Sequence, residues 1–160
     1  METTEKISSL RSVQELSDTL TKMIRETMAP AFADLWLSEA SSDSYVRIGD
    51  DRTKVIDKGH PLLEQIRDKK GPFLIVNHSD PVDDKCALCA PLLAGNDVIG
   101  FMLIGKDISG EPYRQDDFEL LSAVTTQAAL QINNIRLAQE LMAAKEIEAF
   151  HRMSSFIMHD

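Results

Sequence analysis

The chain has 160 residues, of which 43% are hydrophobic and 27% charged, and its formal net charge is −9. This composition indicates a globular protein with its own core, and the acidic balance excludes a general nucleic-acid binder and disfavours an anionic membrane surface. Two cysteines form no disulfide framework, and the sequence shows neither a signal peptide nor an apolar run long enough to span a membrane. We therefore expect a cytoplasmic protein.

Apolar residues recur at steps of three and four from Ile7 to Met28, without glycine or proline. This pattern predicts an amphipathic helix that ends at Ala29-Pro30, because the residue before a proline is pushed out of the helical region. Residues 31–40 and 45–48 each predict a short strand, and the second strand stops at a turn that begins at Gly49.

A short helix is expected to begin at His60-Pro61, since proline fits the first turn of a helix, and to close at Lys69-Lys70-Gly71-Pro72. Residues 73–76 form an apolar strand in this interpretation. Residues 77–85 are polar without periodicity and predict a loop.

Two apolar runs, 86–94 and 98–105, flank Gly95-Asn96-Asp97, which predicts a β-hairpin. Strict alternation would place one set of apolar side chains on each face of the second strand: Val98, Met102 and Ile104 on one, and Ile99, Phe101 and Leu103 on the other. A strand that is apolar on both faces is covered on both. Residues 98–103 should therefore form the central strand of the sheet.

The last predicted helix is capped by Asp116 and runs from Asp117 to the end, since no glycine or proline follows Pro112. About 40 helical residues extend roughly 60 Å, so the last part must project from the domain and needs a partner. Apolar residues recur every seven positions at Ile135, Met142, Ala149 and Phe156, which favours a parallel homodimer through the helices. His159 would face inward in that register unless a stutter follows Ala149.

The elements together predict an α+β layer sandwich within the broad α/β class, with a mainly antiparallel sheet and both terminal helices on one face. We divide the chain into an N-terminal helix (1–28), a sensory domain (29–141) and a signalling helix (142–160).

The hairpin and the last helix carry a motif that resembles the GAF family. Its parts are Pro91-Leu92, Gly95, Val98-Ile99-Gly100, Leu103, Tyr113, Asp116-Asp117 and Phe118. This resemblance implies a GAF-like fold and a sensory or dimerising function. Related domains often form their small-molecule pocket near the segment before the hairpin, which makes Asn77, His78, Asp80 and Cys86 candidate ligand-binding residues.

Residues 150–160, FHRMSSFIMHD, resemble the phosphoacceptor segment of sensor histidine kinases, and the His-Asp form resembles kinases tied to PEP-CTERM export systems. The resemblance implies that His159 is the phosphoacceptor and that Asp160 orients its ring. It also implies a kinase ATP-binding domain and a response regulator as partners, so this stretch alone would be no enzyme.

The residues identify no cofactor. The motif of cyclic-nucleotide-binding relatives and the Cys-His pair of bilin binders are both absent, while His60 and His78 remain as possible haem ligands. Cys86 and Cys89 form a C-x-x-C, but residues three apart on a regular strand point to opposite faces, so a shared metal or a redox pair would need a bulge. A ligand-free dimerisation scaffold and a small redox enzyme of the same fold remain alternatives to the sensor.

Overall fold

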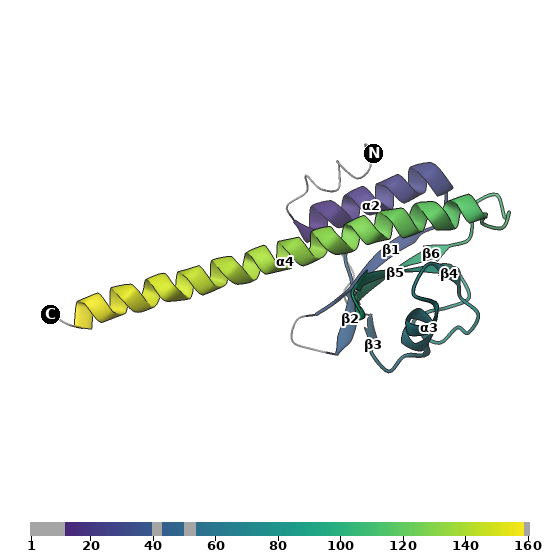
Figure 1. Ribbon diagram of the computed structural model, residues 1–160. Helices are drawn as coiled ribbons and strands as arrows, with labels where there is room; N and C mark the ends of the chain where they lie inside the picture. Colours follow the sequence, from purple (N-terminus) through teal and green to yellow (C-terminus); the bar gives the residue numbers. More distant parts are fainter. Residues whose placement is uncertain (1–11, 40–42, 50–53, 159–160) are drawn as a thin grey trace.

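The computed structural model describes residues 12–39, 43–49 and 54–158. Its elements are α2 (Val13–Met28), β1 (Ala33–Ser38), β2 (Ser44–Arg47), β3 (Val55–Asp57), α3 (Pro61–Lys69), β4 (Phe73–Leu74), β5 (Cys86–Ala94), β6 (Asp97–Gly105) and α4 (Gln115–Met158). The strands pair antiparallel in the order β3-β2-β1-β6-β5-β4. Helices α2 and α4 lie side by side on one face of this sheet and α3 lies on the other (Figure 1). The predicted layer sandwich is confirmed.

Helix α2 has clear boundaries at both ends. The Ser12 hydroxyl accepts a hydrogen bond from the Glu15 N–H at 3.1 Å, as an N-cap should, and Ala29 ends the helix in the left-handed conformation with φ 52°. Ile7 and Leu10, which were expected in this helix, lie outside the described residues. The buried stripe of α2 faces the sheet and α4, and it consists of Leu16, Leu20, Ile24 and Met28.

Strand β6 lies between β1 and β5, so the prediction that residues 98–103 form a central strand is confirmed. Met102 and Ile104 belong to the core under α2 and α4, and Phe101 and Leu103 belong to the core under α3. Both faces are therefore covered, as expected. The face predicted for Val98 was wrong, because it packs on the α3 side with Phe101.

The cause of this difference is a β-bulge. Leu92 pairs with Gly100 and Leu93 pairs with Val98, which leaves Ile99 as an extra residue on β6. The extra residue reverses the alternation, so Ile99 instead lies against the helix-side core.

One strand was missed, and the predicted boundaries of β4 and α4 were wrong. Strand β3 was not predicted, because it has three residues at the edge of the sheet and only Ile56 among them is buried. Strand β4 has two residues rather than four, and Val76 beyond it is 75% exposed. Helix α4 begins at Gln115, so Asp116 lies in the first turn and is not the cap. The Asp117 carboxylate instead accepts the Arg114 N–H at 2.8 Å.

Helix α4 has 44 residues and is about 66 Å long, so only its first half lies on the domain, and the rest projects far beyond it (Figure 1). Ile135, the first member of the predicted seven-residue seam, is 6% exposed and buried within the chain itself. The seam can therefore begin only after this residue. Among the described residues, no helix combines the length and the apolar character that crossing a membrane requires.

Candidate functional site

A hollow with a volume of about 290 Å³ opens between β1, β2 and the loop that precedes β5. We call it the Trp36 hollow. The residues that give it chemical character are Asp34, Trp36, Arg47, Lys54, Asp83, Lys85 and Cys86. Its size is at the lower end of the range for small-molecule pockets.

Trp36, one of the residues that line this hollow, carries a buried hydrogen-bond donor. The residue is 3% exposed, its ring stacks on Phe101 with centroids 6.1 Å apart, and its indole N–H has no partner among the described residues. A buried donor without an acceptor costs free energy comparable to a lost hydrogen bond. An acceptor atom would remove that cost only in an arrangement that brings it to this N–H, which is buried here.

An ion pair lies on the wall of the hollow. The Arg47 guanidinium lies 3.6 Å from the Asp34 carboxylate, and the side chains of both residues are about one-third exposed. Burial raises the pKa of Asp34, and the nearby Arg47 charge offsets part of that rise. With Lys54, Lys85 and Asp83 also present, three cationic and two anionic side chains line the hollow, and this small positive balance favours a ligand that carries a negative or acceptor group.

The two cysteines lie on the same face of β5, which the regular alternation did not predict. Cys86 pairs with Gly105 and Leu88 pairs with the preceding Ile104, so Ala87 is an extra residue in a second bulge. Cys86 and Cys89 consequently both belong to the core on the α3 side. The geometric objection to a cysteine pair is removed.

Their electrostatics nevertheless disfavour thiol chemistry. Burial, with a contribution from the Asp83 charge, raises the pKa of Cys86 to about 11. Burial also raises the pKa of Cys89 well above its usual value, and proximity to Cys86 adds to this rise. Both thiols stay protonated at neutral pH, whereas a reactive cysteine needs the thiolate. Within the described ranges, no three His, Cys, Asp or Glu side chains are grouped so that they could hold a metal ion.

The predicted loop residues are placed differently from one another. Asn77, His78 and Asp80 are exposed and do not line the Trp36 hollow, whereas Cys86 does. His78 donates from Nε2 to the Cys86 carbonyl at 2.8 Å, which ties the loop to the start of β5. The candidate phosphoacceptor pair, His159 and Asp160, lies outside the described residues.

His60, the other candidate haem ligand, uses both ring nitrogens within the fold. Its Nδ1 accepts the Leu62 N–H at 3.0 Å and so caps α3, and its Nε2 donates to the Ser79 carbonyl at 3.0 Å. A ring held in this way has no nitrogen left for iron. The residue thus has a structural role at the start of α3.

Sequence reasoning missed Asp34, Trp36 and Arg47, because the apolar run around Trp36 indicated only a strand. The sequence did contain one signal that could have pointed to these residues. Asp34 and Trp36 are two residues apart and so point to the same face of β1, which puts a charge beside an aromatic ring where a core residue would be expected.

Comparison with known proteins places this architecture in one family. The sequence model of the GAF domain matches residues 12–134, and the chain belongs to the GAF family. No curated protein matches the sequence.

Three solved structures share this fold and are distant in sequence. The GAF domain of a phosphoenolpyruvate-protein phosphotransferase from Coxiella burnetii is 11% identical with a TM-score of 0.70, over 87% of this chain and 93% of that one. A GAF domain/HD domain protein from Geobacter sulfurreducens is 15% identical with a TM-score of 0.66, over 82% and 98%. Free methionine-R-sulfoxide reductase from Neisseria meningitidis, solved with its substrate, is 14% identical with a TM-score of 0.64, over 86% and 87%. At these identities the similarity establishes the fold alone.

Proposed function

We propose that this chain is the cytoplasmic sensory module of a two-component sensor histidine kinase, and that it passes a signal through α4 to the phosphoacceptor His159. The observation that carries this proposal is the continuity of α4. One uninterrupted helix runs from its contact with β5 to Met158, directly before His159. A displacement of the helix at the sheet is therefore delivered to the phosphoacceptor segment.

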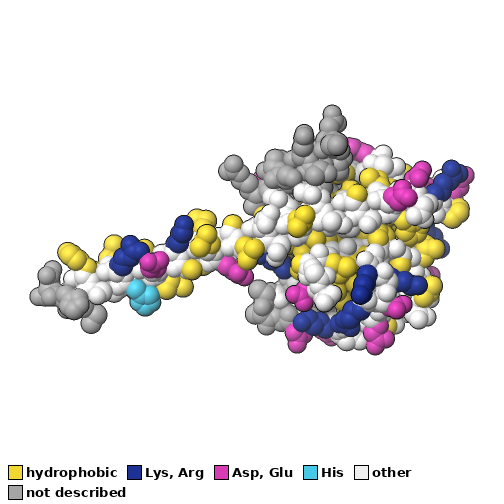
Figure 2. All heavy atoms as spheres, in the orientation of Figure 1, with side chains coloured by type: hydrophobic (Ala, Val, Ile, Leu, Met, Phe, Trp, Pro, Cys, Tyr) yellow, Lys and Arg dark blue, Asp and Glu magenta, His cyan; other side chains and the backbone are white. Residues whose placement is uncertain are grey.

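The projecting part of α4 supports a parallel homodimer. Hydrophobic side chains continue along it with no part of the domain beside them (Figure 2). At 100° per residue, one set of apolar residues falls within an arc of about 100° on a single side, and Glu146 is the one charged residue of 142–157 inside that arc. We call this set the α4 stripe; it consists of Met142, Ala149, Phe150, Met153 and Ile157. Two copies of the stripe can cover each other, and each large side chain in it is more than 60% exposed in the single chain.

The chemistry at the end of α4 is that of a phosphorylatable imidazole. His159 acts as the nucleophile toward the γ-phosphate of ATP held by a kinase ATP-binding domain, and Asp160 orients the ring and accepts its proton. A response regulator then takes the phosphoryl group. The His-Asp form favours a kinase associated with PEP-CTERM export.

The Trp36 hollow is the input site in this proposal, and its ligand is a small molecule with an acceptor or anionic group. Such a ligand changes the output only if it prefers one of two arrangements of the sheet and α4. The Trp36 N–H lacks a partner among the described residues. If the ligand can accept a hydrogen bond from this N–H in one arrangement and not in the other, it stabilises the first.

The test uses the full-length protein and labelled ATP. His159→Gln should abolish labelling, whereas His151→Gln should leave it intact. His151 is the matched control, because it is an exposed histidine on α4, eight residues before His159 in the sequence. Phosphate that remains on the His159→Gln protein, or that moves to His151, would refute the kinase assignment.

The alternative is a GAF scaffold that dimerises without a ligand. The observation that favours it is the filled interior under α3, where Leu62, Leu63 and Ile66 are fully buried. Trp36→Phe distinguishes the two, since it removes the N–H and keeps most of the ring. A sensor should change its level of His159 labelling with this substitution, and a scaffold should not.

A further inference from the structure

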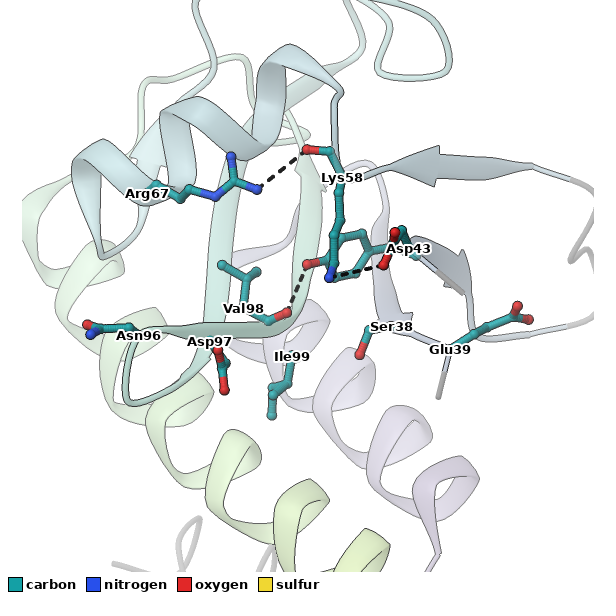
Figure 3. A pocket seen from close by; sticks show the side chains of 10 residues that line it. Ser38, Glu39, Asp43, Lys58, Arg67, Asn96, Asp97, Val98 and Ile99 are labelled. Atoms are coloured by element: carbon teal, nitrogen blue, oxygen red, sulfur yellow. Dashed lines mark hydrogen bonds and ion pairs between the residues drawn. The ribbon is translucent and has the colours of Figure 1, made fainter. Parts of the chain in front are cut away.

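A second and larger opening, with a volume of about 710 Å³, lies at the end of β1 and shares no lining residue with the Trp36 hollow. We call it the Ser38 cleft (Figure 3). Its walls come from the end of β1, the start of β2, the residues around α3 and the first residues of β6. Tyr45 closes its floor with a hydrogen bond from its hydroxyl to the Val98 carbonyl at 2.9 Å.

Two opposite charges in the cleft are uncommitted. The Arg67 guanidinium makes one hydrogen bond among the described residues, to the Lys58 carbonyl at 3.5 Å, which is the limit of the distance range. The Asp97 carboxylate makes no hydrogen bond or ion pair with any described residue. Lys58 differs, because its ammonium group pairs with Asp43 at 3.3 Å.

Arg67 and Asp97 occupy separate walls of the cleft. Arg67 comes from α3 and Asp97 from the first residue of β6, and Figure 3 shows the two side chains apart with the cleft between them. They form no ion pair with each other. A molecule that carries an anionic group and a cationic group at its two ends can pair with both at once.

Ser38 connects this cleft to α4. The Arg136 guanidinium on α4 donates to the Ser38 hydroxyl at 3.2 Å and to the Ser38 carbonyl at 2.6 Å. Ser38 is the last residue of β1 and lines the cleft. Ile99 gives a second route, because it lines the cleft and also lies against the core under the helices.

The position of Arg136 along α4 makes this contact important. Ile135 is 6% exposed and Leu137 is 54% exposed, so Arg136 lies where the helix leaves the domain. The guanidinium is half-buried, and burial lowers its pKa, although arginine stays charged at any neutral pH. The last fixed point of α4 on the domain is therefore a charged hydrogen bond to a residue of the cleft.

We propose that the Ser38 cleft binds a small zwitterion of the amino-acid class, with its anionic group on Arg67 and its cationic group on Asp97, and that the Ser38–Arg136 contact transmits occupancy to α4. The transmission step rests on the proposed function of α4 as the output, whereas the binding step does not. A bound ligand orders the end of β1, which strengthens the hold of Ser38 on Arg136 and restrains α4 at its exit.

The binding step is tested by calorimetric titration of this chain with L-glutamine and γ-aminobutyrate, in parallel with acetate and methylammonium. We expect saturable binding of at least one zwitterion and none of the two single charges at the same concentration. Arg67→Gln and Asp97→Asn should each raise the Kd at least about tenfold, the effect of losing one charged hydrogen bond. Lys69→Gln and Asp84→Asn remove equivalent exposed charges outside the cleft and should leave the Kd unchanged.

The proposed site is overturned if neither zwitterion binds. It is also overturned if Arg67→Gln and Asp97→Asn leave the Kd unchanged.

The transmission step is measured by hydrogen exchange of the α4 amides at 136–142, which should slow when the zwitterion that binds is added. Arg136→Gln should abolish this slowing and keep the Kd, whereas Arg152→Gln, an exposed arginine farther along the same helix, should preserve both. An unchanged exchange rate in the original chain overturns transmission.

These readouts do not depend on phosphorylation. If labelled phosphate stays on the His159→Gln protein while the zwitterion still binds and still slows exchange in α4, the kinase assignment fails and the cleft inference stands. If labelling behaves as proposed and neither zwitterion binds, the cleft inference fails and the kinase assignment stands.

Discussion

Replacing Phe101 by alanine tests the packing on which the sheet depends. Phe101 is fully buried on the central strand β6, opposite Trp36 on β1 and Pro91 on β5. Its ring contacts two other rings, with centroids 6.1 Å from Trp36 and 5.2 Å from Tyr45. Truncating a buried Phe costs about 3–5 kcal/mol. Because two aromatic contacts are lost as well, we expect a loss of about 4 kcal/mol.

The assay is urea unfolding followed by circular dichroism and by the fluorescence of Trp36, the one tryptophan of the sequence. Phe150→Ala is the matched control, since Phe150 is 69% exposed on the projecting part of α4, and its effect should stay within about 0.5 kcal/mol at a concentration where the chain is monomeric. Both variants must be compared at one protein concentration, because dimer formation adds to the apparent stability. A loss below about 1 kcal/mol for Phe101→Ala would refute the central position of β6.

Three further substitutions or titrations have defined outcomes. Gly100→Ala would place a Cβ against the Trp36 carbonyl oxygen of β1, so the free energy of unfolding, measured by thermal unfolding, should fall by about 2–3 kcal/mol. Gly71→Ala is the control, because a Cβ at this position meets open space and should leave the stability nearly unchanged. Because the pKa of Cys86 is raised to about 11, alkylation of this thiol at pH 8 should be about 100-fold slower in the folded chain than in the unfolded chain. The free energy of unfolding should also fall as the pH rises from 9 through 11, because in that range only the unfolded thiol loses its proton. Tyr113→Phe removes a hydrogen bond to the Gly105 carbonyl at 2.6 Å and should cost about 1 kcal/mol in urea unfolding.

The parts of the fold that could be predicted are those whose signal is local. The β5–β6 hairpin has two long apolar runs around Gly95, which lies in the left-handed region with φ 63°. The long helix has no residue that interrupts it after Pro112. Strand β3 has no comparable signal, because an edge strand of three residues with one buried side chain does not differ in pattern from a loop.

The two bulges could not be predicted, and they changed the interpretation of the site. An extra residue at Ala87 or Ile99 depends on how β5 and β6 pair, and neither residue has a local signature. Simple alternation therefore placed Cys86 and Cys89 on opposite faces when they share one.

The candidate sites show the same limit over longer distances. Of the residues predicted to bind a ligand, Cys86 alone lines the Trp36 hollow, because the others are on the loop outside it. The partners Asp34 and Arg47 meet only when β1 and β2 pair. Ser38 and Arg136 are 98 residues apart and meet only because α4 crosses the end of β1.

The homodimer is tested by placing a charge in the α4 stripe. Met153 is 66% exposed, and Met153→Lys would bury one ammonium group from each copy in the proposed seam, at a cost of several kcal/mol per dimer. Ser155→Lys is the matched control, because two residues farther along the helix the side chain points about 160° away from Met153. Light scattering at high micromolar concentration should show a dimer for the original chain and for Ser155→Lys, and a monomer for Met153→Lys. The free energy of unfolding of the monomeric domain should not change, since Met153 contacts no part of the core.

A monomer in the original chain, or a dimer that persists in the Met153→Lys variant, would show that the α4 stripe is not the dimer seam. The relay through a paired α4 would then lose its physical basis.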